Sequence, residues 1–322
     1  MLEVVTHAPE LGTETERERV EALARKAIAT QVLPALGAGG RDFELAIPAY
    51  GKSSLVYLVD VDGGSSFVLR VEPSWRRYPA LRRRRNATLF WLRHELPTPR
   101  LLYQGLSPAT RLKTGLFLLA EQKIEGINLI DQAQHRGGYS ALGRMLARMH
   151  AVRRSWRHGA LSRPKLGSYA AHFRRHNQAR LQQLEREGAL SSEAREKLER
   201  WFEQFEPALR SVKSFNLIHR RCSESDVMID VEGKAWMLKP DGAGFGLFET
   251  DLVRAEVYIC RNDPEKVGRL HQAYFGSFRP EYFRLHESIA PAFRAELHLA
   301  HACLDASRRS TELESLQRIA DV

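Results

Sequence analysis

The sequence predicts an α+β fold in two parts, a small antiparallel sheet followed by a larger, mostly helical part. Within residues 39–122, apolar runs alternate with turn residues, which is the pattern of strands, and one arginine-rich helix interrupts them at 79–94. Beyond residue 122 the apolar spacing is helical over most of the chain. A chain of 322 residues is long enough to bury a sizeable core, and we expect that core to be divided between two lobes.

The first segment, 1–38, predicts a leading amphipathic helix. Residues 13–36 place apolar side chains on one face at helical spacing, and that face comprises Val20, Leu23, Ala24, Ala27, Ile28 and Val32. Three glycines at 37, 39 and 40 then separate this helix from the strand-rich segment.

Further strands and helices follow in a definite order. Strands are expected at 49–59, 67–70 and 117–121. After them come a helix at 142–152, two long helices at 168–188 and 191–212, and a helical tail at 280–309. The two long helices form an insert within the helical part.

A hairpin is predicted late in the chain. Apolar segments at 227–230 and 235–238 flank a turn at Glu232, Gly233 and Lys234. Lys239 stands at the far end of this hairpin, and Asp241 lies two residues beyond it.

The segment just before the hairpin, 219–226, has the spacing of a kinase catalytic loop but different charges. In the kinase pattern H-R-D-x-x-x-x-N, the Asp accepts the substrate hydroxyl proton and the Asn holds magnesium. Here Arg221 occupies the Asp position and Asp226 the Asn position. Arginine stays protonated and has no lone pair to offer, so Arg221 cannot act as a general base.

In order and spacing, these segments resemble the aminoglycoside phosphotransferase and choline kinase family, a bacterial branch of the protein-kinase-like fold. The resemblance implies an N-lobe at 39–122, with a glycine loop and the arginine-rich helix, and a helical C-lobe at 123–322. It implies ATP or another nucleotide as ligand, with nucleotide-binding positions at Gly51, Lys52, Ser53, Ser54, Arg70 and Glu121. In kinases a hairpin such as 227–238 leads to a metal-binding Asp, and Lys239 holds that position here.

The departures from the family pattern make the site more positively charged. The third-strand Lys is Arg70, and its usual Glu partner falls at Asn86. The family's Asp, Asn and Asp carry two negative charges, whereas Arg221, Asp226 and Lys239 carry a net charge of +1. Such a site should repel magnesium unless Asp226 and Asp241 are steered together, and Arg221 and Lys239 could instead hold phosphate oxygens directly.

Other residues near the loop have simpler interpretations. The family resemblance implies that His219 is structural and that Asp251 braces the loop at the start of a helix. Cys222 could be a thiol of lowered pKa, but a small, partly buried side chain is the preferred interpretation.

Three classes of function follow. We favour a catalytically degenerate kinase-like protein, a pseudokinase that binds a nucleotide, a small anion or a partner protein in a regulatory or scaffolding role. The first alternative is an active ATP-dependent small-molecule phosphotransferase with a displaced site, in which Asp226 and Asp241 hold metal and Glu224 or Asp226 serves as base. The second is a basic interaction module for nucleic acid or an anionic membrane.

Composition bears on the partner and the compartment. The net charge of +10 and arginine clusters at 76–77, 82–85 and 153–154 with Arg157 suit an anionic partner, although an arginine-preferring genome gives the same composition. Three scattered cysteines, the lack of a membrane-span-length apolar stretch and an N-terminus unlike a secretion signal together indicate a cytoplasmic protein.

Overall fold

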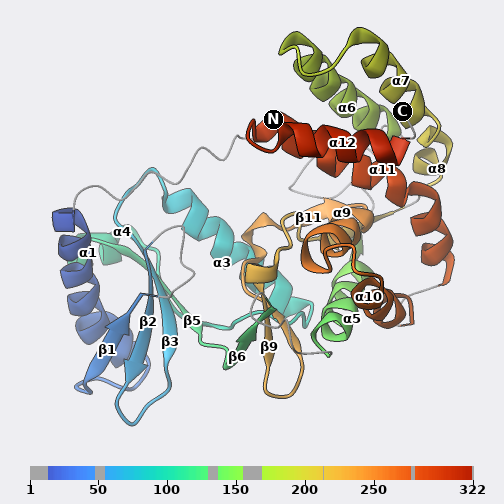
Figure 1. Cartoon of the computed structure of the whole chain (residues 1–322). Helices are drawn as coiled ribbons and strands as arrows, with labels where there is room; N and C mark the ends of the chain where they lie inside the picture. The colour runs from blue at the N-terminus through green and yellow to red at the C-terminus, as the bar shows by residue number, and fades with distance from the viewer. Residues whose placement is uncertain are drawn as a thin grey trace. The chain divides into compact units, whose positions relative to one another are not determined.

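The computed structural model describes residues 14–47, 55–129, 137–154, 169–212, 214–276 and 280–320. The chain forms two compact units, Met1–Asn128 with Ser225–Asp241, and Leu129–Glu224 with Gly242–Val322. The first unit contains the five-stranded sheet and the second is mostly helical, so the α+β prediction is confirmed (Figure 1).

The first unit is built on an antiparallel sheet in the order β1-β2-β3-β5-β4. Its strands are β1 Phe43–Ala46, β2 Leu55–Val61, β3 Phe67–Glu72, β4 Leu101–Gly105 and β5 Phe117–Gln122. Val68 of β3 pairs with Glu121 of β5, and Arg70 pairs with Leu119. Because paired residues share a face and side chains alternate along a strand, Arg70 and Glu121 lie diagonally on the same face of the sheet.

The predicted leading helix packs against this sheet. Helix α1, Glu14–Ala27, continues through a π-helical turn, η1 Ile28–Val32, into the short α2, Leu33–Ala35. The predicted apolar face is confirmed, since five of its members are buried in one cluster with β2, β3 and β5: Val20, Ala24, Ala27, Ile28 and Val32. Leu23 is partly buried at the edge of that cluster.

Two more helices and the hairpin complete the first unit. Helix α3, Tyr78–Arg93, is the predicted arginine-rich helix, and α4 spans Pro108–Thr114. The hairpin strands β9 Val227–Asp230 and β10 Ala235–Met237 form a second sheet with β6 Gly126–Asn128. A Cβ at Gly126 would meet the carbonyl oxygen of Ile229, so the close approach of β6 to β9 requires glycine there.

The second unit is mostly helical. Its helices are α5 Gly138–Ala151, α6 Tyr169–Arg186, α7 Ser192–Glu203, α8 Glu206–Arg210, α9 Glu249–Arg254, α10 Pro264–Gly276, α11 Pro280–Leu304 and α12 Arg309–Ala320. A π-helical segment, η7 Ala255–Ile259, continues α9. Helices α6, α7 and α8 form the predicted insert, and its second helix, expected at 191–212, is divided into α7 and α8. All three share a buried core with α11 and α12.

A small sheet in the order β11-β8-β7 carries the loop that begins at His219. Its strands are β7 Arg153–Arg154, β8 Phe215–Ile218 and β11 Gly244–Gly246. Strand β8 is buried at every position, so the loop begins from a firmly packed strand.

The predicted helical tail at 280–309 is present as α11, which ends at Leu304, and a further helix, α12, begins at Arg309. Asp305 causes the break, because its carboxylate accepts hydrogen bonds from the backbone N–H and the hydroxyl of Ser307. No helix in the described ranges is both long enough and apolar enough to span a membrane.

Candidate functional site

The first unit brings Arg70 and Glu121 together, and adds an arginine that the sequence analysis missed. Arg70 Nε lies 2.8 Å from Glu121 Oε2. Arg84 of α3 donates to both oxygens of the same carboxylate, from Nε at 2.6 Å and from Nη2 at 2.9 Å. Glu121 therefore bridges two guanidinium groups.

Arg84 also reaches the segment after the hairpin. Its Nη1 donates to Asp241 Oδ1 at 3.1 Å, and its Nη2 donates to the carbonyl oxygen of Leu238. The side chains of Arg84 and Glu121 are only 5% and 2% exposed. Arg84 thus links α3, β5 and the end of the hairpin within the first unit.

Burial and the neighbouring positive charges have opposite effects on the pKa of Glu121. Burial alone would raise the pKa of Glu121, but the charges of Arg84 and Arg70 hold it below its usual value. Burial and the neighbouring charge of Arg84 together lower the pKa of Arg70. The carboxylate is therefore ionised, and its negative charge offsets the repulsion between the buried Arg84 and the partly buried Arg70.

A signal for Arg84 was present in the sequence. The buried residues of α3 are Leu81, Arg84, Thr88 and Trp91, which follow the three-to-four residue spacing of a helix face. Asn86, which the family resemblance places as the partner of Arg70, is exposed. Of the arginine run 82–85, Arg82 and Arg83 are exposed while Arg84 points inward.

Asp226 and Lys239, which occupy the two metal-ligand positions of the kinase pattern, form an ion pair instead. Lys239 Nζ lies 2.7 Å from Asp226 Oδ1. Asp226 is 8% exposed, whereas Lys239 is 46% exposed. The carboxylate at the Asn position of the kinase pattern is thus neutralised by the ammonium at the metal-binding Asp position.

The two carboxylates that could take part in a magnesium site are both paired with cations. Magnesium needs carboxylate oxygens that can face the metal and prefers octahedral geometry. Here the Asp226 carboxylate is paired with Lys239 and the Asp241 carboxylate with Arg84. Each carboxylate would have to exchange its paired cation for the metal before it could act as a ligand.

The second unit holds the loop that carries Arg221. Asp251 is fully buried and accepts the backbone N–H groups of His219 at 2.5 Å and Arg220 at 2.7 Å. Arg220 has a φ of 70°, a left-handed conformation that these two hydrogen bonds stabilise. Arg221 is exposed, and its stem lies beside Gly242, where an added Cβ would be 3.8 Å from Cδ.

The remaining candidate residues divide into three groups. Gly51, Lys52, Ser53 and Ser54 lie outside the described residues. Glu224, the candidate base of the displaced site, pairs with Arg261 Nη2 at 3.5 Å within the second unit. Cys222 is fully buried, in keeping with the simpler interpretation of that residue.

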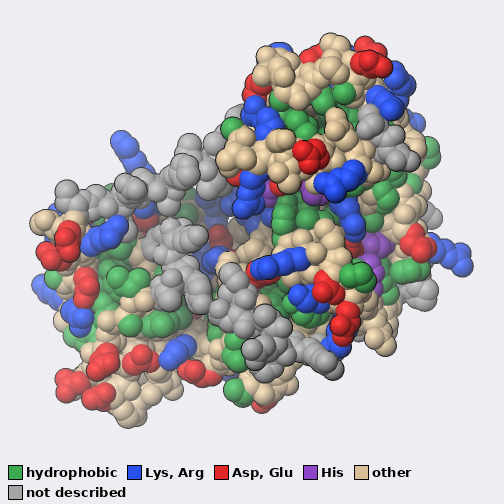
Figure 2. All heavy atoms as spheres, in the orientation of Figure 1, with side chains coloured by type: hydrophobic (Ala, Val, Ile, Leu, Met, Phe, Trp, Pro, Cys, Tyr) green, Lys and Arg blue, Asp and Glu red, His purple; other side chains and the backbone are tan. Residues whose placement is uncertain are grey.

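Surface charge was the basis of the nucleic-acid and membrane alternative. Figure 2 shows Lys and Arg side chains interspersed with Asp and Glu over the described part of the visible face. Arg153 and Arg154 each lie over an aromatic ring, Tyr282 at 4.8 Å and Phe245 at 5.1 Å. Both stems are therefore packed against the second unit, and a basic partner surface stays a prediction.

Comparison with known families gives one match. The model of the phosphotransferase enzyme family matches residues 45–297, which is more than half of the chain. No curated protein matches the sequence.

Solved structures share the fold at low identity. A putative fructosamine-3-kinase from Thermobifida fusca YX-ER1 is 17% identical, with 91% of this chain and 98% of that chain covered and a TM-score of 0.59. A microcompartment-associated aminopropanol kinase is 19% identical, with 93% and 94% covered and a TM-score of 0.55. A streptomycin–ATP–APH(2")-IIa ternary complex is 10% identical, with 94% and 96% covered and a TM-score of 0.55.

Proposed function

The chain belongs to the phosphotransferase enzyme family, and on that premise we propose that it is a non-catalytic member, a pseudokinase that binds a nucleotide without a divalent metal. Its role would be regulatory or scaffolding. The observation that carries the proposal is the 2.7 Å ion pair between Lys239 Nζ and Asp226 Oδ1. Two positions that supply metal ligands in the kinase pattern are here joined to each other.

A phosphotransfer step needs a general base and carboxylates that bind a metal, and the residues at those positions have a different chemistry here. A general base must accept a proton, and Arg221 has no lone pair for it. A metal bridging the nucleotide phosphates needs available carboxylates, and Asp226 and Asp241 are paired with Lys239 and Arg84. These substitutions favour binding without turnover.

The same residues supply positive charge for an anion. Arg70 is 17% exposed and Lys239 is 46% exposed, so both cations reach the surface of the first unit. Guanidinium and ammonium groups bind phosphate oxygens by charge-assisted hydrogen bonds. The APH(2")-IIa protein, which shares this fold, binds ATP in its ternary complex with streptomycin.

Calorimetric titration with ATP and ADP tests the proposal, once with magnesium and once with a chelator. We expect binding that is equal or tighter in the chelator, because free nucleotide carries more negative charge. Lys239→Ala should weaken binding at least 5-fold, while Lys113→Ala, an exposed lysine on α4, should leave it unchanged. Binding that strictly requires magnesium would sink the metal-free proposal.

The family match favours a second candidate, an active ATP-dependent small-molecule phosphotransferase. Asp241 is 47% exposed, so one carboxylate near the end of the hairpin is still accessible to solvent. In that case a sensitive assay would detect ATP turnover with an added small-molecule acceptor, and Asp226→Ala and Asp241→Ala would each abolish it. Turnover that survives both changes would indicate a contaminating kinase.

A further inference from the structure

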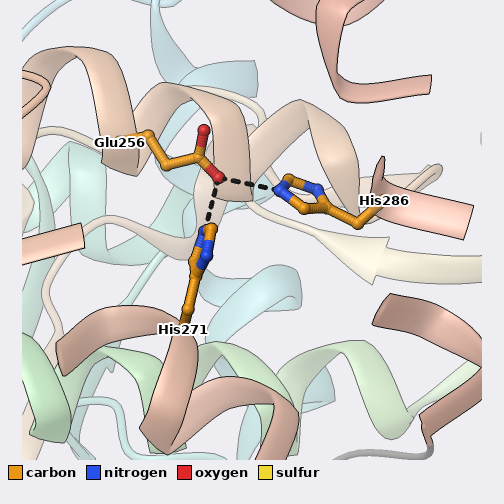
Figure 3. A group of neighbouring side chains, drawn as sticks. All are labelled: Glu256, His271 and His286. Atoms are coloured by element: carbon orange, nitrogen blue, oxygen red, sulfur yellow. Dashed lines mark hydrogen bonds and ion pairs between the residues drawn. The ribbon is translucent and has the colours of Figure 1, made fainter. Parts of the chain in front are cut away.

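Two histidines and one glutamate meet within the second unit. His271 Nε2 lies 2.8 Å and His286 Nε2 lies 3.1 Å from Glu256 Oε1. Figure 3 shows both rings pointing at the same carboxylate oxygen. One ligand atom from each residue lies within 4.8 Å of the others.

Three successive helical elements supply these side chains. Glu256 lies in the π-helical segment η7, His271 on α10 and His286 on α11. A π-helical turn contains an extra residue, which redirects side chains and is frequent at functional sites. The cluster therefore depends on the packing of three helices within one unit rather than on a single surface.

Neighbouring side chains hold the group in place. Arg294 Nη2 donates to Glu256 Oε2 at 2.5 Å, which orients the carboxylate so that Oε1 faces the imidazoles. Phe275 packs against both rings, with centroid separations of 5.3 Å to His271 and 5.5 Å to His286. Such support of the ligands by further contacts is typical of metal sites.

Of the three residues in the group, His271 is the most exposed. Glu256 is 1% and His286 is 7% exposed, whereas His271 is 24% exposed. An ion can therefore approach from solvent along His271. The buried carboxylate supplies a negative charge, and the two imidazoles supply neutral nitrogen ligands when unprotonated.

The geometry points to a divalent transition-metal site formed by Glu256, His271 and His286, and we propose Zn²⁺ as its ion. Two imidazoles and one carboxylate are a known zinc ligand set that leaves the fourth position to water. Ligand atoms about 2.0–2.1 Å from a tetrahedral zinc lie about 3.3 Å apart. The observed nitrogen-to-oxygen separations of 2.8 and 3.1 Å need only a small outward shift to reach that spacing.

A purely structural role is the competing explanation. Two neutral imidazoles can each donate an Nε2–H to Glu256 Oε1, with Arg294 on the other oxygen, and no ion is then needed. A side chain that only donates hydrogen bonds can be replaced by glutamine, but a metal ligand cannot. This difference makes His271→Gln the informative variant.

The test uses the full chain, purified and freed of metal with a chelator, and titrated with Zn²⁺. Displacement by Co²⁺ gives a second signal, because tetrahedral cobalt absorbs visible light strongly. We expect one Zn²⁺ per chain, and at least 10-fold weaker binding for both Glu256→Gln and His271→Gln. His298→Gln is the matched control. Like His286, His298 lies on α11, and it pairs with the carboxylate of Glu312 at 2.6 Å.

Each outcome decides the proposal. Loss of the Zn²⁺ and Co²⁺ signals in His271→Gln, with the signals kept in His298→Gln, supports it. The proposal is overturned if the chain binds no stoichiometric Zn²⁺, or if His271→Gln binds it as tightly as the parent chain. It is also overturned if the Zn²⁺ and Co²⁺ signals are lost only in His298→Gln. If Glu256→Gln fails to fold, the partly exposed His271 still decides, with circular dichroism confirming that this variant is folded.

Discussion

Arg84 donates two hydrogen bonds to Glu121, one to each carboxylate oxygen, at 2.6 and 2.9 Å. The family resemblance implies a lysine on the third strand paired with a glutamate on the following helix. Here the helix contributes the cation, and the carboxylate lies on β5. An ion pair between this helix and the sheet is therefore present, with the cation on the helix and the anion on the sheet. Arg70 of β3 contacts the same carboxylate as a second cation.

Removing the charge of Glu121 should destabilise the first unit. Glu121→Gln leaves Arg70 and Arg84 close together and poorly compensated, and breaking a buried ion pair costs about 3–5 kcal/mol. We expect a loss of that size in the free energy of unfolding, measured by urea denaturation. Arg85→Met removes the next guanidinium on α3, which is partly exposed and bonds Gln104, and should change the unfolding free energy by less than about 1 kcal/mol. Equal effects for the two variants would contradict the assigned role of Glu121.

Restoring an acid at position 239 should create affinity for magnesium. Lys239→Asp removes the ammonium 2.7 Å from Asp226 and places a second carboxylate close by. Binding at tenfold excess over the dissociation constant stabilises by about 1.4 kcal/mol. Magnesium should therefore raise the melting temperature of this variant by about 2–4 °C.

Two controls accompany that measurement. The unmodified chain should show no such shift, and Lys239→Ala, which only removes the cation, should show a smaller one. A magnesium-induced shift of equal size in the unmodified chain would mean that the ion pair does not exclude the metal.

Glu249 should make stability depend on pH. It is completely buried, and burial raises its pKa to about 8 from an ordinary value of 4.5. Between these values the folded chain keeps a proton that the unfolded chain releases, so the free energy of unfolding falls as pH rises. The slope from this group is about 1.4 kcal/mol per pH unit at most, and it ends above pH 8.

Glu249→Gln should remove that slope between pH 5 and 8, because the amide has no proton to lose. Urea unfolding at a series of pH values measures it. Glu265→Gln, at a side chain that is 72% exposed, is the control and should keep the slope of the parent chain. The depressed pKa of Glu256, about 2, acts in a separate window, since its contribution is lost only as pH falls below about 4.5.

The sequence predicted those features that local patterns determine. Apolar alternation predicted the strands β2, β3 and β5, and helical spacing predicted the leading helix and the inserted helices, whereas β1 and β4 were not predicted. Arg84 was missed because a run of four arginines suggests a solvated helix, and its partners Glu121, Leu238 and Asp241 are all distant in the sequence. The separation of Glu256, His271 and His286 along the chain likewise matches no short motif, so only the packing of η7, α10 and α11 brings them together.

Two glycines of the second unit should respond in opposite ways to alanine. At Gly143 of α5 an added Cβ would lie 2.5 Å from the carbonyl oxygen of Leu270 on α10, a distance that backbone atoms can relieve only by moving. Gly143→Ala should therefore cost about 1–3 kcal/mol by overpacking. Gly268 is exposed on α10 and an added Cβ there would meet nothing within 4 Å, so Gly268→Ala should gain about 0.5–1 kcal/mol from helix propensity. Urea unfolding of both variants measures the difference, and a stabilising Gly143→Ala would mean that α5 and α10 do not approach as closely as this contact requires.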